Sequence, residues 1–124
     1  SGNEVSFQTK TRQRNITLPA TTLADDGHMI WIKRGVNDGS DVHIIPNTFT
    51  KRKFKGTVGN NIINEDKTYP TYLVTDRGDY RTDYRNIESN GDAMCFVFFA
   101  GMSVKIDGVQ YVGAWVQWKN PRDW

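Results

Sequence analysis

The residues with the greatest capacity for chemistry lie close together in DRGDYRTDYR, residues 76–85. This stretch holds three arginines, three aspartates and two tyrosines: Arg77, Arg81, Arg85, Asp76, Asp79, Asp83, Tyr80 and Tyr84. Carboxylates can transfer protons, arginines can bind phosphate or carboxylate, and Arg77-Gly78-Asp79 is the tripeptide of adhesion motifs. The composition is therefore compatible with a catalytic site, a nucleic-acid patch, an adhesion motif or a solvated loop.

A catalytic site would need two carboxylates in environments that push their pKa values apart. The arginines between the aspartates instead favour the ionised form of every carboxylate. A hydrolase would require two of Asp76, Asp79, Asp83 and Glu88 to converge in one pocket. We therefore predict that the chain is not an enzyme.

The spacing of the charges offers a second interpretation. Arginine recurs at every fourth residue, which would permit one short helical turn laced by ion pairs. Gly78 and the brevity of the repeat favour an irregular loop, and a three-residue adhesion motif carries little information. We predict a charged surface loop in which Arg77, Arg81 and Arg85 could form salt bridges between subunits.

Ligands for a metal or a cofactor are sparse. His28 and His43 are expected on neighbouring strands, but zinc sites usually take three or four ligands, and Cys95 lies inside an apolar run. We interpret these residues as two strand histidines and a small buried thiol. The sequence contains no Gly-x-Ser-x-Gly motif and no phosphate-binding loop. The prediction is therefore no catalytic residue, no metal and no cofactor.

The basic run KRKFK, residues 51–55, surrounds an aromatic residue, as in some sites that hold phosphate and stack a base. The whole chain, however, has 16 basic and 14 acidic residues and a net charge of +2. A single short run is more typical of a solvated turn or of an edge strand protected by lysines. We predict no nucleic-acid partner.

Aromatic residues concentrate toward the C-terminus. Trp115, Trp118 and Trp124, with Tyr80 and Tyr84, are candidates for contact with a sugar or with another protein. A strict strand alternation places Trp115 on the same face as Tyr111 and Gln117, and Trp118 on the opposite face. Core packing of one of these faces is the alternative interpretation.

Turn residues divide the chain into short strands. In HMIWIKR, Ile30 and Ile32 are expected to face the core, while Met29, Trp31 and Lys33 lie on the other face. The expected strands cover residues 15–18, 28–34, 41–46, 61–63, 71–75, 93–100, 103–106 and 109–118. A hairpin is expected between 28–34 and 41–46, and another around Asp107-Gly108, where the dipeptide favours a tight turn. Gly101 is expected to end the apolar run.

The length of 124 residues fits one domain, residues 1–124, which we interpret as a fragment of a longer chain. No stretch has the roughly 20 apolar residues of a membrane-spanning helix, and the N-terminus lacks the pattern of a signal peptide, so membrane insertion is not expected. A lone cysteine excludes an intramolecular disulfide. No long segment has a period of 3.6 residues. The expected fold is an all-β sandwich or a small barrel-like domain with little helix.

A resemblance is carried by NITLPATTLADDGHMIWIKRGVNDGSDVHIIPN, residues 15–47, and by KIDGVQYVGAWVQW, residues 105–118. The first segment has a strand that ends in Leu-Pro, an Asp-Gly turn, an Ile-x-Ile strand and a third strand that leads to Pro-Asn. The second is a hairpin with a tyrosine strand before a Gly-x-Trp strand. Together they resemble the β-rich modules of tailed-phage baseplate and tail-fibre proteins. Residues 48–92 have no counterpart in this resemblance.

The resemblance implies a structural virion component that forms homotrimers, binds other tail or baseplate proteins and is assembled in the host cytoplasm. Its role would be protein-protein contact in the phage tail. The alternative is a carbohydrate-binding, lectin-like tip that uses exposed aromatic residues beside Asp and Asn to hold a host-surface glycan. Aromatic residues exposed in a groove would favour the glycan role, and the same residues buried between subunits would favour the scaffold.

Overall fold

A computed structural model describes residues 13–35, 39–87 and 92–118, without the side chains of 52–58 and 61–65. Within these ranges the chain forms strands and one 3-10 turn, η1 (Leu23–Asp25), but no α-helix. The strands are β1 (Gln13–Thr17), β2 (Met29–Lys33), β3 (Asp41–Ile45), β4 (Thr48–Val58), β5 (Asn61–Pro70), β6 (Tyr72–Val74), β7 (Tyr80–Arg81), β8 (Arg85–Ile87), β9 (Ala93–Ile106) and β10 (Val109–Gln117). The predicted all-β class is confirmed.

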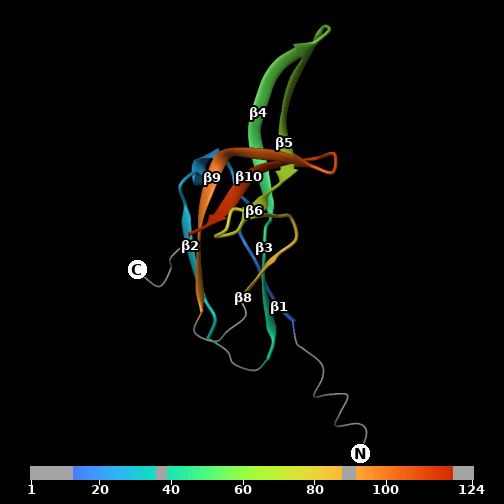
Figure 1. Ribbon diagram of the computed structural model, residues 1–124. Helices are drawn as coiled ribbons and strands as arrows, with labels where there is room; N and C mark the ends of the chain where they lie inside the picture. Colours follow the sequence, from blue (N-terminus) through green and yellow to red (C-terminus); the bar gives the residue numbers. More distant parts are fainter. Residues whose placement is uncertain (1–12, 36–38, 88–91, 119–124) are drawn as a thin grey trace, which may run out of the picture.

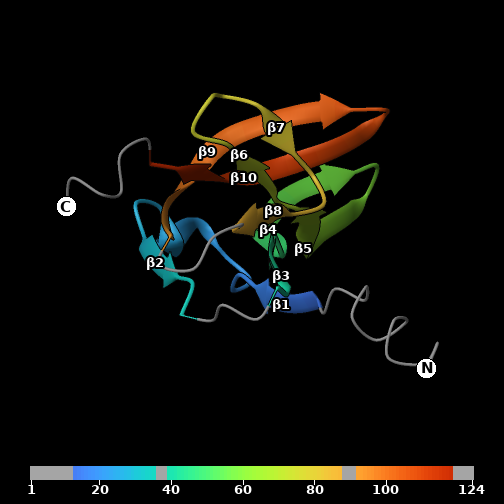
Figure 2. The same ribbon diagram turned by 60° about the horizontal axis from the view of Figure 1, so that its bottom comes forward.

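The strands form three sheets, which do not close into a barrel (Figures 1 and 2). A three-stranded sheet has the order β1-β3-β8, and a five-stranded sheet has the order β2-β9-β10-β6-β7. β4 and β5 form a two-stranded ribbon. Two of the pairings are parallel, β1 with β3 and β10 with β6, so the sheets are mixed.

The core lies between the five-stranded sheet and the three-stranded sheet. Phe96, Phe98 and Trp115 come from the first sheet, Ile44 and Ile87 come from the second, and all five side chains are 0% exposed. Ile30 and Ile32 pack against this cluster, which confirms the predicted inner face of β2. Burial of these apolar side chains is the main force that holds the two layers together.

The hairpin around Asp107-Gly108 is confirmed. Ile106 pairs with Val109, and the two turn residues have φ values of 50° and 80°. A two-residue turn with positive φ at both positions matches the right-handed twist of the flanking strands, which explains the preference for Asp-Gly. The prediction that Gly101 ends the apolar run was wrong for the strand, because β9 continues to Ile106.

A bulge at Gly113 corrects the predicted side-chain alternation of β10. The register with β9 shifts between Val112 and Ala114, and Gly113 has a φ of 81°. As a result, Val112 packs on the same side as Trp115, while Tyr111 packs with Ala114. The predicted grouping of Tyr111 with Trp115 was wrong, because residues 100–102 of β9 lie opposite the single Gly113, and this irregularity changes the faces beyond it.

The expected hairpin between residues 28–34 and 41–46 was also wrong. β2 pairs with β9 in the five-stranded sheet, and β3 pairs with β1 and β8 in the other sheet. The two strands therefore belong to different layers. Turn residues between two strands mark a change of direction, and they do not determine whether the strands pair.

The β4–β5 ribbon rises away from both sheets (Figure 1). Its base is fixed by Phe49, which is 1% exposed in the core, and by hydrogen bonds that link Thr21 with Thr48 and Thr50. Beyond the base, β4 and β5 pair with each other and with no other described strand. The segment predicted as a strand at 61–63 belongs to β5.

Candidate functional site

The first half of the charged stretch is a turn between β6 and β7. The backbone N–H of Thr75 donates to the carbonyl of Asp79, and the Thr75 hydroxyl accepts hydrogen bonds from the backbone N–H groups of Arg77 and Asp79. Gly78 has a φ of 88°, which a residue with a Cβ rarely adopts. The predicted irregular loop is confirmed, and the alternative of a helical turn is excluded.

Arg85 connects the two layers from β8. Its Nε donates to Oε1 of Gln117 at 3.0 Å, and its guanidinium lies 3.4 Å from the Asp76 carboxylate. Gln117 is only 6% exposed, so this bond satisfies a buried acceptor on β10. Arg85 therefore has a structural role within the chain, in contrast to the predicted role in contacts between subunits.

Arg81 is held by its own neighbours. It forms an ion pair of 3.0 Å with Asp83 and lies over the Tyr84 ring, which stacks on His43 with 3.8 Å between ring centroids. Burial works to raise the pKa of Asp83, but hydrogen bonds from the Tyr84 backbone and from Arg81, with the Arg81 charge, outweigh it and lower that pKa. The pair is exposed and contributes little to stability.

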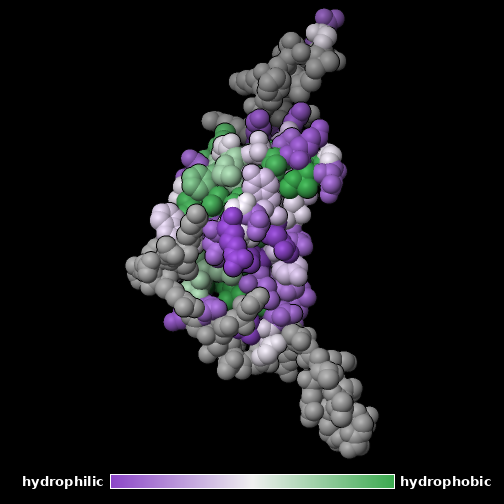
Figure 3. Space-filling view, in the orientation of Figure 1, coloured by the Kyte–Doolittle hydropathy of each residue, from purple (hydrophilic) through white to green (hydrophobic). Residues whose placement is uncertain are grey.

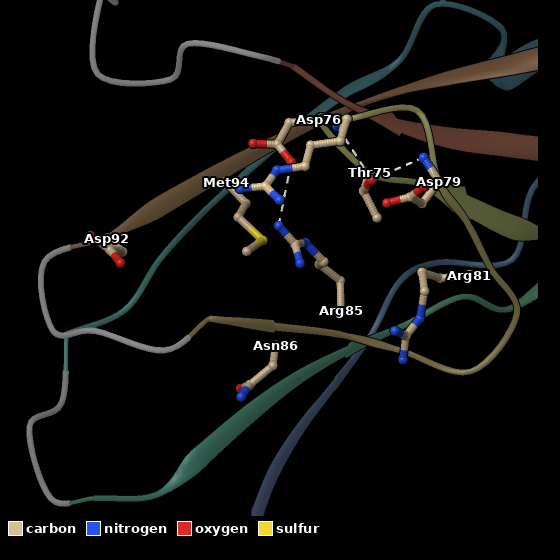
Figure 4. Close-up of a pocket in the computed structure, with 9 residues that line it drawn as sticks. Thr75, Asp76, Asp79, Arg81, Arg85, Asn86, Asp92 and Met94 are labelled. Atoms are coloured by element: carbon tan, nitrogen blue, oxygen red, sulfur yellow. Dashed lines mark hydrogen bonds and ion pairs between the residues drawn. The ribbon is translucent and has the colours of Figure 1, made fainter.

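These residues surround a hollow of about 560 Å³ at the edge of the two layers (Figure 4). Its lining consists of Thr75, Asp76, Arg77, Asp79, Arg81, Arg85, Asn86, Asp92 and Met94. Figure 4 shows Arg85 reaching toward Asp76, with Asp79 beside Thr75. Within the lining Arg85 is paired with Asp76, and Arg81 is paired with Asp83, which lies outside the lining.

The five-stranded sheet has a second face, turned away from the core. Strand register places Met29, Trp31 and Lys33 of β2 on this face, opposite Val97, Cys95 and Ala93 of β9. Val116 lies opposite Val97, and the N–H of Trp118 donates to the Cys95 carbonyl at 2.7 Å. We call this surface the outer face. Figure 3 shows hydrophobic surface over β9 and hydrophilic surface around β6.

The outer face separates the predicted aromatic residues into two groups. Trp115 points into the core and is 0% exposed, so it cannot serve as a contact residue, and that prediction was wrong. Trp118 is 48% exposed and Tyr80 is 52% exposed. Tyr84 is half-buried against His43. Trp124 lies outside the described residues.

Sequence reasoning missed Trp31 and Phe99 as site residues. Trp31 is 47% exposed and Phe99 is 43% exposed. For Trp31 a signal was present, because the alternation in HMIWIKR already placed it opposite the core-facing isoleucines. Phe99 carried no such signal, because it lies in an unbroken apolar run, residues 93–100.

The histidines and the cysteine do not come together. His28 precedes β2, with its ring 6.3 Å from Trp115, whereas His43 lies on β3 in the other sheet. Cys95 is buried in β9, and burial raises the pKa of its thiol to about 11. Among the described residues, no group of three or more His, Cys, Asp or Glu is arranged to hold a metal ion.

Comparison with known proteins adds no relative: no family model, curated protein or solved structure matches this chain. The resemblance to phage tail modules therefore stays a prediction. In the described part of the chain, no helix is long and apolar enough to cross a membrane.

Proposed function

We propose that this chain is a structural module of a phage tail baseplate or tail fibre. It acts through protein-protein contacts, without catalysis, and forms homotrimers that also bind neighbouring tail proteins in the virion. The observation that carries this proposal is the projecting β4–β5 ribbon (Figure 1). The phage context is supported by the sequence resemblance over residues 15–47 and 105–118.

The ribbon is difficult to explain in an isolated domain. A two-stranded hairpin is marginally stable at best in water, because it has no third strand or second layer against which to bury a face. The part of β4 beyond Lys51 extends roughly 20 Å at the usual rise of a strand. Contact with another chain would supply the missing layer, as expected for a component of a larger assembly.

The charged hollow agrees with a contact role better than with catalysis. Two arginines of its lining are engaged in ion pairs, Arg85 with Asp76 and Arg81 with Asp83 beside the hollow. A general acid needs a carboxyl group whose pKa is raised toward neutrality, but the pKa of Asp83 is lowered. Arg77 and Asp79, on the exposed turn, are the groups from this stretch that remain suited to ion pairs with a partner.

A second candidate is carbohydrate binding. The specific observation in its favour is the hollow of about 560 Å³, whose lining of Asp, Asn and Arg offers both donors and acceptors to sugar hydroxyl groups. The described lining contains no aromatic ring on which a sugar could stack. For this reason the contact role is the better supported of the two.

The test is the molar mass of the full chain by light scattering over a hundredfold concentration range. A second sample would lack residues 52–66, with Lys51 joined to Lys67 through Asn-Gly. These two lysines are paired in the ribbon, so a two-residue turn can close it there. We expect a trimer for the full chain and a weaker association for the shortened chain. A strict monomer with a positive glycan-array signal would favour carbohydrate binding instead.

A further inference from the structure

Another hollow lies where the β9–β10 hairpin runs beside the base of the β4–β5 ribbon (Figures 1 and 2). Its volume is about 480 Å³, within the range of sites that hold small ligands. Both elements contribute to its lining, which consists of Lys51, Tyr69, Ala100, Gly101, Met102, Ser103, Gln110 and Val112. We call it the ribbon groove. It shares no lining residue with the charged hollow around Arg85.

Strand register explains which face of the ribbon lines the groove. Phe49 pairs with Tyr69, and Lys51 pairs with Lys67. Directly opposite residues share a face, so these four side chains lie on one side of the ribbon. A Cβ built on Gly113 of β10 would lie 3.4 Å from the Phe49 ring. The same side of the ribbon is therefore turned toward β10.

The Gln110 side chain offers the groove a positioned acceptor. Its Nε2 donates to the carbonyl oxygens of Val104 and Tyr111, each at 3.2 Å, and these two bonds use both N–H groups of the amide. No described hydrogen bond reaches the side-chain oxygen. A ligand that pairs with Gln110 therefore supplies a donor, such as a hydroxyl group.

The charges of the groove are positive. Lys51 belongs to the lining, Lys67 lies opposite it in register, and Lys105 lies opposite Gln110. No described ion pair engages any of these three amines. The described lining contains no carboxylate, and Asp66 lines a separate hollow beside η1. An anionic group on a ligand would form charge-assisted hydrogen bonds with these lysines.

The remaining lining is apolar and aromatic. Tyr69 is half-buried, and its ring makes no described contact with another ring. Ala100 is buried, and Met102 and Val112 are half-buried. A sugar ring can pack its apolar face on such a surface, whereas inorganic phosphate has no apolar face. Single-stranded nucleic acid stacks successive bases on several rings, but the described lining has one.

We propose that the ribbon groove binds an acidic saccharide, a sugar chain that carries a carboxylate. The carboxylate pairs with Lys51, one sugar ring packs on Tyr69, and a hydroxyl group donates to Gln110. This inference goes beyond the proposed function, because binding in this groove does not require copies of the chain to associate.

The test is a titration of the isotope-labelled full chain, followed by NMR of the backbone amides. The probes are sialyllactose and trigalacturonate, which carry carboxylates, and lactose, which carries none. Each probe is added to the unchanged chain and to the variants Lys51→Gln, Lys51→Arg and Lys33→Gln. Lys33→Gln is the matched control, because it removes the same charge from an exposed lysine on β2, outside the groove. The amide spectra also show whether each variant retains the fold.

We expect an acidic saccharide to shift the amides of Tyr69, Gly101 and Gln110, and lactose to bind at least about tenfold more weakly. Lys51→Gln should weaken binding about tenfold, the loss expected for one hydrogen bond to a charged group. Lys51→Arg and Lys33→Gln should bind like the unchanged chain.

The inference is overturned if neither acidic saccharide shifts these amides at millimolar concentration, if lactose binds equally well, or if Lys33→Gln weakens binding as much as Lys51→Gln. Shifts confined to the hollow around Arg85 would also overturn it and would favour the second candidate function. Tighter binding of a single-stranded oligothymidylate at the same amides would assign the groove to nucleic acid instead. A chain that binds the saccharide but stays monomeric in light scattering would contradict the proposed function alone.

Discussion

The two faces of the five-stranded sheet use similar residues in opposite ways. Phe98 and Phe99 are adjacent on β9, yet Phe98 is 0% exposed and Phe99 is 43% exposed. Trp115 and Trp118 differ in the same manner, at 0% and 48%. The inner face is covered by the β1-β3-β8 sheet, whereas the outer face has a smaller cluster, in which Tyr72, Val74 and Ala114 are buried.

This difference shows that an apolar strand sequence indicates burial but does not identify the layer that covers each face. A strand that is apolar on both faces is expected between two layers. Here the β1-β3-β8 sheet is the layer that covers the inner face, and it leaves Phe99 exposed on the other side. The predictions below separate the two faces, beginning with the largest expected effect.

The adjacent phenylalanines provide the sharpest contrast. Phe98→Ala should lower the free energy of unfolding by about 3–5 kcal/mol, because it leaves a cavity in the core beside Trp115. Phe99→Ala should change it by less than about 1 kcal/mol, because Phe99 is 43% exposed. Urea unfolding at low protein concentration measures both. Equal losses would contradict the assignment of the two faces.

Gly113→Ala should lower the free energy of unfolding by about 2–4 kcal/mol, because it strains the backbone and overpacks the inner face. A Cβ at this position would lie 2.6 Å from Cζ of Phe98, and the φ of 81° disfavours any residue with a side chain. The control is Gly101→Ala, where a Cβ would meet no atom within 4 Å. The thermal unfolding midpoint of Gly113→Ala should be lower than that of Gly101→Ala. Similar midpoints would contradict the bulge at Gly113.

Arg85→Met should lower the free energy of unfolding by about 1–2 kcal/mol, because the buried side-chain oxygen of Gln117 loses its hydrogen-bond donor. Arg77→Met removes an arginine from the same hollow without breaking a described hydrogen bond of its side chain, so its effect should stay within about 0.5 kcal/mol. Chemical denaturation of both proteins checks the difference. If Arg77→Met lowered the free energy of unfolding more than Arg85→Met, the role of Arg85 in linking the two layers would be misassigned.

The Cys95 thiol should have the smallest effect on the pH dependence of stability near neutral pH. Its folded pKa of about 11 exceeds the usual pKa of 9.0, so the folded state retains a proton that the unfolded state releases between those values. Stability from this group is therefore complete below pH 9 and declines as pH rises toward 11. A comparison with Cys95→Ala across that interval isolates the effect. A thiol reagent that labels the folded chain rapidly at pH 7 would contradict the burial.

Local patterns predicted a substantial part of the fold. The Asp107-Gly108 hairpin, the β6 strand and the inner position of Ile30 and Ile32 all depend on neighbouring residues, and all were predicted correctly. Pairings between distant segments were not predictable in this way. The partner of β2 is β9, more than 60 residues away, and no local signal connects them.

The candidate site was predicted in part. The charged loop was expected, but the buried Gln117 that holds Arg85 was not, since that contact joins residues 32 positions apart. The Gly113 bulge reversed the expected alternation of Tyr111, and glycine in a strand could have signalled it. Exposure of Trp31 followed from the alternation of β2, whereas exposure of Phe99 had no signal in its apolar neighbours.

The most direct test of the central claim is the unfolding midpoint measured at several protein concentrations, for the unchanged chain and for the chain in which Asn-Gly replaces residues 52–66 of the β4–β5 ribbon. If the chain forms the proposed homotrimer through this ribbon, the midpoint of the unchanged chain rises with concentration, because association stabilises the folded state. The midpoint of the shortened chain should depend less on concentration. Midpoints that depend on concentration equally in both proteins, or in neither, would contradict the account.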